Sequence, residues 1–317
     1  MDKIAILTRD CAGVNASIRS VVRTAFYHNM EVVGVLRGYD GLIDCEFLPL
    51  NRRSVSGIIN QGGSILKASR SKRFRNETGQ KQAVQTIQDN DIDGVIVIGG
   101  NGSLTGAHIL ATRYDIPVIG IPATIDNDIN GVDLSIGSDT AVNVALDALD
   151  KIRDTATSLE RIFVIEVMGR NSGYIALQVA LAGGCEEVFV PEMDSNIEST
   201  YEEIQGSYNK GKVSWIVVVS EGKAKAHDIA AAITKNTGLE TRVAVLGHIQ
   251  RGGRPTTIDR ILAARLGNYA VDVLRNGATD QCVSLKNDML ITIPLSVAIQ
   301  PKDIDVNGFY KLIKILT

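Results

Sequence analysis

Short apolar segments alternate with longer amphipathic segments along nearly the whole chain. The short segments are rich in Val and Ile, which predicts strands that are covered on both faces. The longer segments repeat their apolar residues at the spacing of a helix. The predicted strands are 4–7, 32–36, 94–98, 118–121, 162–167, 188–190, 215–219 and 243–246. The predicted helices are 14–28, 80–90, 103–113, 139–157, 172–182, 197–210, 226–236 and 259–274.

This alternation is typical of βαβ units, so the sequence predicts an α/β fold with mainly parallel sheets flanked by helices. A length of 317 residues is sufficient for two domains. No linker rich in Gly or Ser marks a boundary, and the region 131–139 is the predicted first crossing between the domains. The last segment, 291–317, contains two prolines and shows no clear pattern.

The composition narrows the class of protein. With 44% hydrophobic residues, 22% charged residues and a formal net charge of −3, the chain shows no overall affinity for nucleic acids or anionic membranes. Its four cysteines are far apart and lack metal-ligand spacing, which is typical of reduced thiols in the cytoplasm. The apolar run 4–7 is too short for a signal peptide, and no segment approaches the roughly 18 apolar residues of a membrane helix. We therefore expect a soluble cytoplasmic protein.

A hydroxyl and two carboxylates follow the predicted strand 118–121. They belong to Thr124, Asp126 and Asp128. Open α/β sheets usually bind ligands at the carboxyl ends of their strands. One carboxylate there could accept the proton of a hydroxyl nucleophile in phosphoryl transfer, and the other could help to hold a phosphate-bound metal ion. In the alternative interpretation, Asp126, Asn127 and Asp128 only cap backbone amides in an Asx-type turn.

A glycine-rich loop, 99–103, leads from a predicted strand into a predicted helix. Its glycines would let a phosphate approach the backbone, and Ser103 is the predicted N-cap of the helix. The alternative is a tight turn without a ligand. The basic segment 70–75 could add cations near this loop, Arg70 among them, or it could be a solvated charged face.

Charged side chains also follow the predicted strands in the second half of the chain. The segments 166–170, 220–222 and 241–253 offer arginine, glutamate and histidine side chains. Guanidinium groups bind phosphate and carboxylates bind hydroxyls, so this set suits a sugar phosphate. Each residue alone could form a surface ion pair, and the hypothesis depends on their convergence at strand ends.

Several of these segments, in this order, resemble the bacterial 6-phosphofructokinase family. The matching segments are 98–103 (IGGNGS), 122–128 (PATIDND), 151–156 (KIRDTA), 166–170 (EVMGR) and 246–253 (LGHIQRGG), within a resemblance that extends from residue 3 to about residue 283. The resemblance implies a two-domain α/β fold, a homotetramer, and transfer of the γ-phosphate of MgATP to the 1-hydroxyl of fructose 6-phosphate. The implied nucleotide-binding domain comprises 1–137 and 250–302, and the implied sugar-phosphate-binding domain comprises 138–249 and 303–317.

The resemblance also assigns roles to single residues. It implies that Asp126 is the general base. Thr124 and Asp128 would flank the transferring phosphoryl group, and Arg170 would stabilise its charge. The implied sugar-phosphate ligands are Met168, Gly169, Glu221, His248 and Arg251, with Arg161 and Arg242 contributed by a neighbouring subunit. The implied ATP ligands are Arg70, Gly100, Asn101, Gly102 and Ser103, with magnesium at Asn101 and Asp128. An allosteric site for ADP or phosphoenolpyruvate is matched by Arg19, Arg23, Arg52, Arg153, Glu186, Lys210 and Lys212.

The departures from the family pattern concentrate on the nucleotide. The loop 8–13 is shorter than the family's loop and lacks its paired glycines and its proline. Asn101 stands where the family has a magnesium-binding aspartate, and a neutral amide is a weaker ligand for a hard dication. Ala123 replaces the glycine that is usual in ATP-dependent members, and Gly57 replaces an effector-site aspartate. Relatives that use pyrophosphate typically have Asp in place of Gly102 and Lys in place of Ala123, so a change of phosphoryl donor is not supported.

Two hypotheses follow from these observations. In the first, the protein is an ATP-dependent 6-phosphofructokinase of glycolysis with an altered nucleotide loop. In the second, it is a catalytically impaired paralogue that binds fructose 6-phosphate or effectors as a regulatory subunit, in a tetramer mixed with a second phosphofructokinase. The intact base and the complete sugar-phosphate set favour the first hypothesis. The coincident changes on the ATP and magnesium side favour the second.

Overall fold

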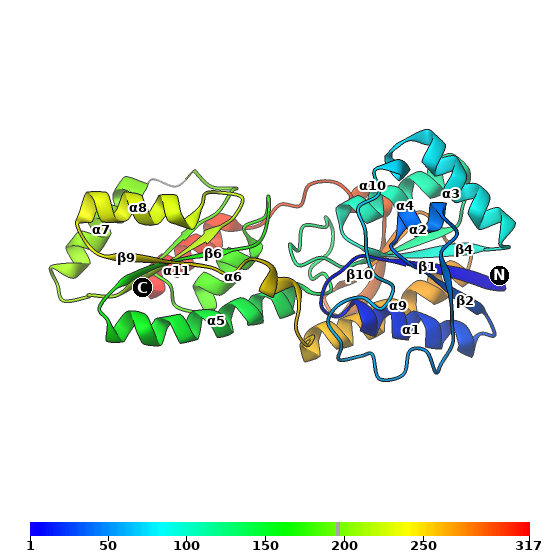
Figure 1. Cartoon of the computed structure of the whole chain (residues 1–317), viewed down its shortest axis with the longest axis horizontal. Helices are drawn as coiled ribbons and strands as arrows, with labels where there is room; N and C mark the ends of the chain where they lie inside the picture. Colours follow the sequence, from blue (N-terminus) through cyan, green and yellow to red (C-terminus); the bar gives the residue numbers. More distant parts are fainter. Residues whose placement is uncertain (195–196) are drawn as a thin grey trace. The chain divides into compact units, whose positions relative to one another are not determined.

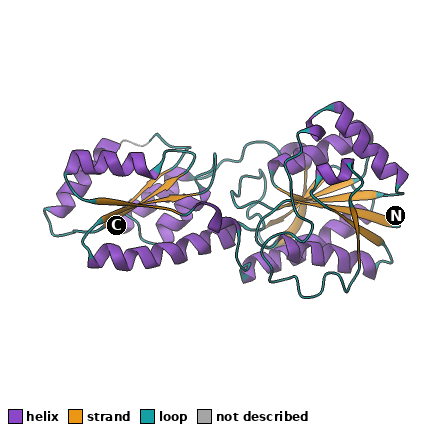
Figure 2. Cartoon of the chain, in the orientation of Figure 1, coloured by secondary structure: helices purple, strands orange, loops and turns teal. Residues whose placement is uncertain are grey.

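The computed structural model describes residues 1–194 and 197–317, which form two compact units (Figure 1). The first unit comprises Met1–Thr140 and Arg251–Lys302, and the second comprises Ala141–Gln250 and Asp303–Thr317. In each unit a β-sheet lies between helices (Figure 2). The described residues contain no helix that combines the length and the apolar composition needed to cross a membrane.

The sheet of the first unit has the strand order β11-β10-β5-β4-β1-β2-β3 among the described residues. Its strands are β1 (Lys3–Thr8), β2 (Glu31–Val35), β3 (Phe47–Leu50), β4 (Gly94–Gly99), β5 (Val118–Pro122), β10 (Gln281–Lys286) and β11 (Met289–Pro294). The inner strand pairs are parallel, and the edge strands β3 and β11 pair antiparallel with β2 and β10. Because β1, β4 and β5 are parallel neighbours, the loops that follow them emerge along the same edge of the sheet.

The sheet of the second unit has the strand order β7-β8-β6-β9, and its described pairs are all parallel. The strands are β6 (Ile162–Val167), β7 (Glu187–Phe189), β8 (Trp215–Ser220) and β9 (Thr241–Val245). Every residue of β8 is buried, as expected for a parallel strand that is covered on both faces.

The helices cover the faces of the two sheets. Those of the first unit are α1 (Val14–Tyr27), α2 (Tyr39–Ile43), α3 (Glu77–Asp89), α4 (Asn101–Tyr114), α9 (Thr257–Arg275) and α10 (Leu295–Ala298). Those of the second unit are α6 (Tyr174–Ala182), α7 (Ile197–Tyr208), α8 (Ala226–Thr237) and α11 (Val306–Leu316), while α5 (Ser138–Ser158) begins in the first unit and continues into the second. Short 3₁₀ turns occupy Arg73–Arg75 and Gly247–Arg251. Helix α1 packs on α9, and Gly267 permits a close approach because a Cβ there would lie 2.7 Å from Ser20 Cβ.

The predicted α/β fold class is confirmed, and each predicted strand and helix corresponds to an element whose ends differ by a few residues. The sequence did not predict α2, β3, β10, β11, α10 or α11. β3 carries Pro49 at the sheet edge and β10 mixes polar with apolar residues, so neither has the continuous apolar run of an inner strand. The segment 291–317, which showed no clear pattern, forms the end of β11 and the helices α10 and α11.

Candidate functional site

Asp126 lies in the loop that follows β5, at the carboxyl end of the first unit's sheet. Asn127, whose φ of 47° is left-handed, holds this loop together. Its side chain accepts a hydrogen bond from the Ser135 amide at 2.9 Å and donates one to the Asp133 carbonyl at 3.1 Å. The Thr124 hydroxyl accepts a hydrogen bond from the Asp126 amide at 3.2 Å. The loop therefore fixes a carboxylate that is only 5% exposed close to a hydroxyl.

Asp128, in the same loop, is directed at Asn101. Its Oδ2 accepts a hydrogen bond from Asn101 Nδ2 at 2.8 Å. The Oδ1 atoms of both residues are buried and have no hydrogen-bond partner in the described part of the chain. The amide-capping interpretation thus applies to Asn127 and Thr124, while Asp128 presents a carboxylate oxygen that the loop does not use.

The pair of Asn101 and Asp128 fits a magnesium ion that is bound mainly through phosphate. An amide oxygen and a carboxylate oxygen, both buried and without partners among the described residues, are the hard ligands that magnesium takes. The pair carries one negative charge where two aspartates would carry two, so phosphates and water would supply most of the coordination. No cluster of three or more His, Cys, Asp or Glu side chains with metal-binding geometry occurs in the described ranges.

Helix α4 begins at Asn101, with Gly100 as its N-cap residue, so the prediction that Ser103 is the N-cap is wrong. The backbone is already helical two residues before Ser103, whose side chain is buried in the first turn. Gly102 is exposed, and a Cβ there would meet no atom within 4 Å. The predicted nucleotide residues 100–103 therefore form the N-terminus of α4, where unpaired amides and the helix dipole favour an anion, while Arg70 lies outside this helix.

Two glycines permit close packing around this N-terminus. A Cβ on Gly99 would lie 2.6 Å from Ser103 Oγ, which real contacts essentially never show. A Cβ on Gly100 would lie 3.2 Å from Thr124 Cβ. The two glycines therefore permit the close packing of β4, α4 and Thr124, and this packing is compatible both with a phosphate-binding loop and with a tight turn.

The short loop between β1 and α1 is held by side chains. Asp10 Oδ1 accepts a hydrogen bond from the Ser64 amide at 3.1 Å. Arg9 passes over Gly99, where a Cβ would lie 2.9 Å from Arg9 Cγ, and its Nη1 donates to the Ser69 carbonyl. This loop thus brings a guanidinium group, instead of a run of glycine amides, to the edge of the sheet.

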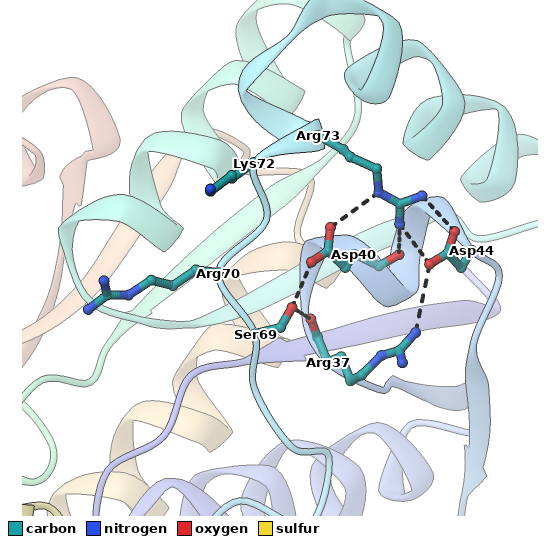
Figure 3. A pocket seen from close by; sticks show the side chains of 7 residues that line it. All are labelled: Arg37, Asp40, Asp44, Ser69, Arg70, Lys72 and Arg73. Atoms are coloured by element: carbon teal, nitrogen blue, oxygen red, sulfur yellow. Dashed lines mark hydrogen bonds and ion pairs between the residues drawn. The ribbon is translucent and has the colours of Figure 1, made fainter.

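A cavity of about 450 Å³ opens beside the basic segment (Figure 3). Its lining residues are Arg37, Asp40, Asp44, Ser69, Arg70, Lys72 and Arg73. Arg73 Nη2 donates to Asp44 Oδ2 at 2.6 Å, and this hydrogen bond keeps the pKa of Asp44 below its ordinary value. Arg73 therefore belongs to an ion-pair network, whereas Arg70 and Lys72 are exposed and point away from both carboxylates (Figure 3).

In the second unit, four predicted residues come together at the ends of β6 and β8. Met168, Gly169 and Arg170 follow β6, and Glu221 follows β8. The Arg170 amide donates to Glu221 Oε1 at 3.2 Å. Gly169 has a φ of 152°, and a Cβ there would lie 2.2 Å from the Ser172 carbonyl oxygen, so a larger residue does not fit. The carboxyl end of the second sheet thus carries an arginine and a glutamate side by side.

Arg161 and Arg242 are joined by a residue that the sequence did not indicate, Glu240. Arg161 Nε donates to Glu240 Oε2 at 2.9 Å, and Arg242 pairs with Glu240 Oε1. The two guanidinium groups are thereby held next to each other on one carboxylate. A pair of adjacent guanidinium groups is a common way to bind phosphate.

The segment after β9 contributes His248 and Arg251. His248 is exposed, and its neighbour Gln250 is fully buried and accepts a hydrogen bond from the Met168 amide at 2.9 Å. Gln250, which the sequence did not indicate, therefore ties this segment to the end of β6. Arg251 is the first residue of the returning segment of the first unit, so it belongs to a different unit from the other sugar-phosphate candidates.

The residues matched to an allosteric site divide between the units. Arg19, Arg23 and Arg52 belong to the first unit, and Arg153, Glu186, Lys210 and Lys212 belong to the second. Within the second unit, Lys212 Nζ lies 3.0 Å from Glu186 Oε1, and Arg153 Nη2 donates to the Gly184 carbonyl at 3.0 Å. Lys210 is exposed two residues before Lys212. Each unit thus holds part of the predicted set.

Sequence reasoning missed other residues near the first unit's site. Tyr39 is partly buried and stacks on Phe74 with ring centroids 4.0 Å apart, and desolvation raises the pKa of its phenol. Burial lowers the pKa of Lys302, while the carboxylates of Asp133 and Asp128 act in the opposite direction. Neither residue lies in a recognisable sequence motif. Aromatic residues make up only 5% of the chain, and this scarcity was the only feature of the sequence that set Tyr39 apart.

Comparison with known proteins identifies relatives of full length. The model of the family described as Phosphofructokinase matches residues 3–274. The ATP-dependent 6-phosphofructokinase of Thermotoga petrophila is 45% identical over 319 residues, and that of Halothermothrix orenii is 44% identical over 331 residues, with 100% of both chains covered in each case. Among solved structures, the phosphofructokinase of Saccharomyces cerevisiae matches with a TM-score of 0.88 and 31% identity. That match covers 94% of this chain and 45% of the yeast chain, so this chain spans less than half of the yeast protein.

Proposed function

We propose that this chain, which belongs to the phosphofructokinase family, uses Asp126 as the general base of its reaction. The chain is a kinase that transfers the γ-phosphate of ATP to the 1-hydroxyl of fructose 6-phosphate, giving fructose 1,6-bisphosphate and ADP. The observation that carries the assignment of the base is the buried carboxylate of Asp126, in the loop that also brings Asp128 to Asn101. This loop follows β5, at the edge where such sheets bind ligands.

Asp126 would accept the proton of the 1-hydroxyl as its oxygen attacks the γ-phosphorus of ATP. Its low exposure would limit the access of bulk water to the carboxylate that takes this proton. Thr124 would lie beside the transferring phosphoryl group, because its side chain packs against the N-terminus of α4. Arg170 would stabilise the charge that develops on that group.

The donor phosphates would bind at the N-terminus of α4, through the backbone of 100–103 and the guanidinium of Arg70. A magnesium ion held by those phosphates, Asn101 and Asp128 would neutralise the phosphate charge. The hydrogen bond from Asn101 to Asp128 supports this part of the proposal, because it holds the two side chains together while each keeps a buried Oδ1 without a partner among the described residues.

Most of the proposed acceptor ligands belong to the second unit, and Arg251 belongs to the first. Met168, Gly169 and Glu221 would contact the sugar, since Glu221 is held beside the end of β6. His248 and Arg251 would bind its phosphate. The proposal therefore assigns a main role to each domain. Residues 1–137 and 250–302 would form the donor-binding domain, and residues 138–249 and 303–317 would form the acceptor-binding domain.

Arg161 and Arg242 would act on the sugar phosphate of a neighbouring subunit in a homotetramer. Their common partner Glu240 supports this role, because it holds both guanidinium groups in place for a phosphate. The charged groups of Arg153, Glu186 and Lys212 would take part in an allosteric site for an anionic effector, a nucleotide or phosphoenolpyruvate. Sizing of the purified protein tests the tetramer, and titration with ADP and phosphoenolpyruvate tests the effector site.

The comparisons lend no support to a catalytically impaired regulatory paralogue, because the full-length relatives are named as ATP-dependent enzymes. A coupled assay for fructose 1,6-bisphosphate tests the function directly. We expect turnover with MgATP and fructose 6-phosphate, and only background turnover when pyrophosphate replaces ATP. Lack of product at high enzyme concentration, with sugar-phosphate binding still visible by calorimetry, would contradict the kinase activity.

Replacing Asn101 with Asp is expected to lower the magnesium concentration for half-maximal activity by about three- to tenfold, because it adds a charge to the cation site. Without magnesium, the new carboxylate would repel that of Asp128, and the hydrogen bond that Asn101 donates to Asp128 would be lost. The variant should therefore melt at a lower temperature than wild type in EDTA, and added magnesium should narrow this difference. Asn130→Asp is the control for the magnesium dependence, since it adds the same charge to the loop of Asp128 at a side chain that donates to the Val297 carbonyl instead. An unchanged magnesium dependence would show that Asn101 is not a ligand.

A further inference from the structure

The segment 69–73 is anchored at every second residue by one carboxylate, that of Asp40 in α2. Ser69 Oγ donates to Asp40 Oδ2 at 2.9 Å, and Ser71 Oγ donates to Asp40 Oδ1 at 2.5 Å. Arg73 Nε lies 3.5 Å from Asp40 Oδ1, and Arg73 Nη2 donates to the Asp40 carbonyl at 3.3 Å. One side chain of a short helix thus holds three side chains of a segment about thirty residues away in the sequence.

The two residues between these anchors are the cations Arg70 and Lys72. Both are exposed, and both point away from Asp40 (Figure 3). Arg70 and Lys72 each lie between two anchored residues, so the anchors fix the backbone on both sides of each cation. In the described part of the chain, no carboxylate is paired with either cation, and their charges are open to an anion from solution.

Two further contacts place this segment beside the N-terminus of α4. Arg9 donates to the Ser69 carbonyl from the loop after β1. Phe74 stacks on Tyr39, whose hydroxyl donates to the Ser103 carbonyl at 2.7 Å in the first turn of α4. Both ends of the segment are therefore tied to the edge of the sheet where the donor phosphates are proposed to bind.

We propose that Asp40 is a positioning residue for the phosphoryl donor: by anchoring 69–73, it holds Arg70 and Lys72 in place to bind the phosphates of ATP. This inference rests on the proposed donor site and adds Lys72 to its ligands. A fixed cation binds an anion more tightly than a mobile one, because less side-chain and loop freedom is lost on binding. Without Asp40, the two exposed cations would stay on the chain but lose their common orientation.

The charge state of Asp40 agrees with this role. Burial acts to raise the pKa of Asp40, but the hydroxyls of Ser71 and Ser69 and the guanidinium of Arg73 outweigh it and keep the pKa below its ordinary value. The carboxylate is therefore ionised at neutral pH and accepts charge-assisted hydrogen bonds. An amide at this position would accept weaker ones.

Asp40→Ala is expected to raise the KM for ATP about tenfold, since segment 69–73 would have to be ordered on binding. The kcat and the KM for fructose 6-phosphate should stay within about twofold of wild type, because Asp40 touches no reacting group. Asp40→Asn keeps an acceptor oxygen and should lie between wild type and Asp40→Ala. Calorimetry with ADP checks the binding step, and thermal unfolding checks the fold; if Asp40→Ala does not fold, Asp40→Asn serves for the same comparison.

Asp44→Asn is the matched control. Asp44 ends the same helix and pairs with the same Arg73, but its contacts do not include Ser69 or Ser71. Its KM for ATP should therefore remain close to wild type. A general weakening of the ion-pair network would affect both aspartate variants equally and would overturn the proposal.

The combined variant Arg70→Gln/Lys72→Gln tests the route through the cations. We expect it to raise the KM for ATP at least as much as Asp40→Ala, and adding Asp40→Ala to it should have no further effect. A wild-type KM in the combined variant, or an undiminished effect of Asp40→Ala in that background, would overturn the proposal. Either result leaves the proposed function standing as long as wild type turns over, whereas wild type without turnover would refute the proposed function itself.

Discussion

Replacing Asp126 with Ala is expected to lower kcat by about 10²–10⁴-fold, which is the usual contribution of a general base. The affinity for fructose 6-phosphate should change little, because the proposed sugar-phosphate ligands belong to other segments. The loop itself should persist, since Asn127 holds it through Ser135 and Asp133. Steady-state kinetics give kcat, and calorimetry with fructose 6-phosphate gives the affinity in the absence of turnover.

Two variants sharpen this comparison. Asp126→Asn keeps the size of the side chain and removes its basicity, so it should be nearly as slow as Asp126→Ala. Asp133→Asn removes an exposed carboxylate from the same loop and should behave as wild type. If Asp126→Asn turns over within about tenfold of wild type, Asp126 is not the base.

The position of Asp126 could be predicted because it depends on the inner strands. β4 and β5 are apolar runs in which every residue is buried, and such runs identify parallel strands covered on both faces. Parallel neighbours end at one edge, so the loops after them had to lie close together. The hydrogen bond between Asn101 and Asp128 shows that the segments after β4 and β5 do lie close together. Sequence reasoning expected only a weak metal ligand at Asn101, and its role in orienting Asp128 became visible in the structure.

The supporting residues could not be predicted, because each depends on a partner far along the chain. Asp40 looks like an ordinary polar residue of a short helix until its contacts with Ser69 and Ser71 are seen. In the sequence, those serines alternate with Arg70 and Lys72. A solvated charged surface shows the same pattern, so the sequence alone does not indicate an anchored segment. Glu240 had no neighbouring motif, although it joins two arginines that had been singled out separately.

Asp259 is the most consequential structural residue that the sequence analysis did not single out. It is fully buried at the start of α9, where its Oδ1 accepts a hydrogen bond from the Gly137 amide at 2.8 Å. Its Oδ2 accepts one from the Thr140 amide at 2.8 Å and another from the Thr140 hydroxyl. These contacts hold the start of α5, directly after the loop that carries the proposed base. Burial raises the pKa of Asp259, and the hydrogen bonds from Thr140 and Gly137 oppose the shift without cancelling it.

Asp259→Asn is therefore expected to lower the free energy of unfolding by about 2–4 kcal/mol, because its NH₂ group would face a buried backbone donor and leave that donor unpaired. Urea unfolding measures the loss. The matched control is Asp288→Asn, which removes an exposed carboxylate paired with Arg265 of the same helix and should cost less than about 1 kcal/mol.

The raised pKa of Asp259 adds a pH test. Ionising Asp259 is harder in the folded protein than in the unfolded chain, so its contribution to stability falls as the pH rises above the ordinary carboxyl pKa. The stability lost in Asp259→Asn should accordingly be larger at acid pH than at neutral pH. Equal losses of unfolding free energy in Asp259→Asn and Asp288→Asn would show that Asp259 does not hold α5 in place.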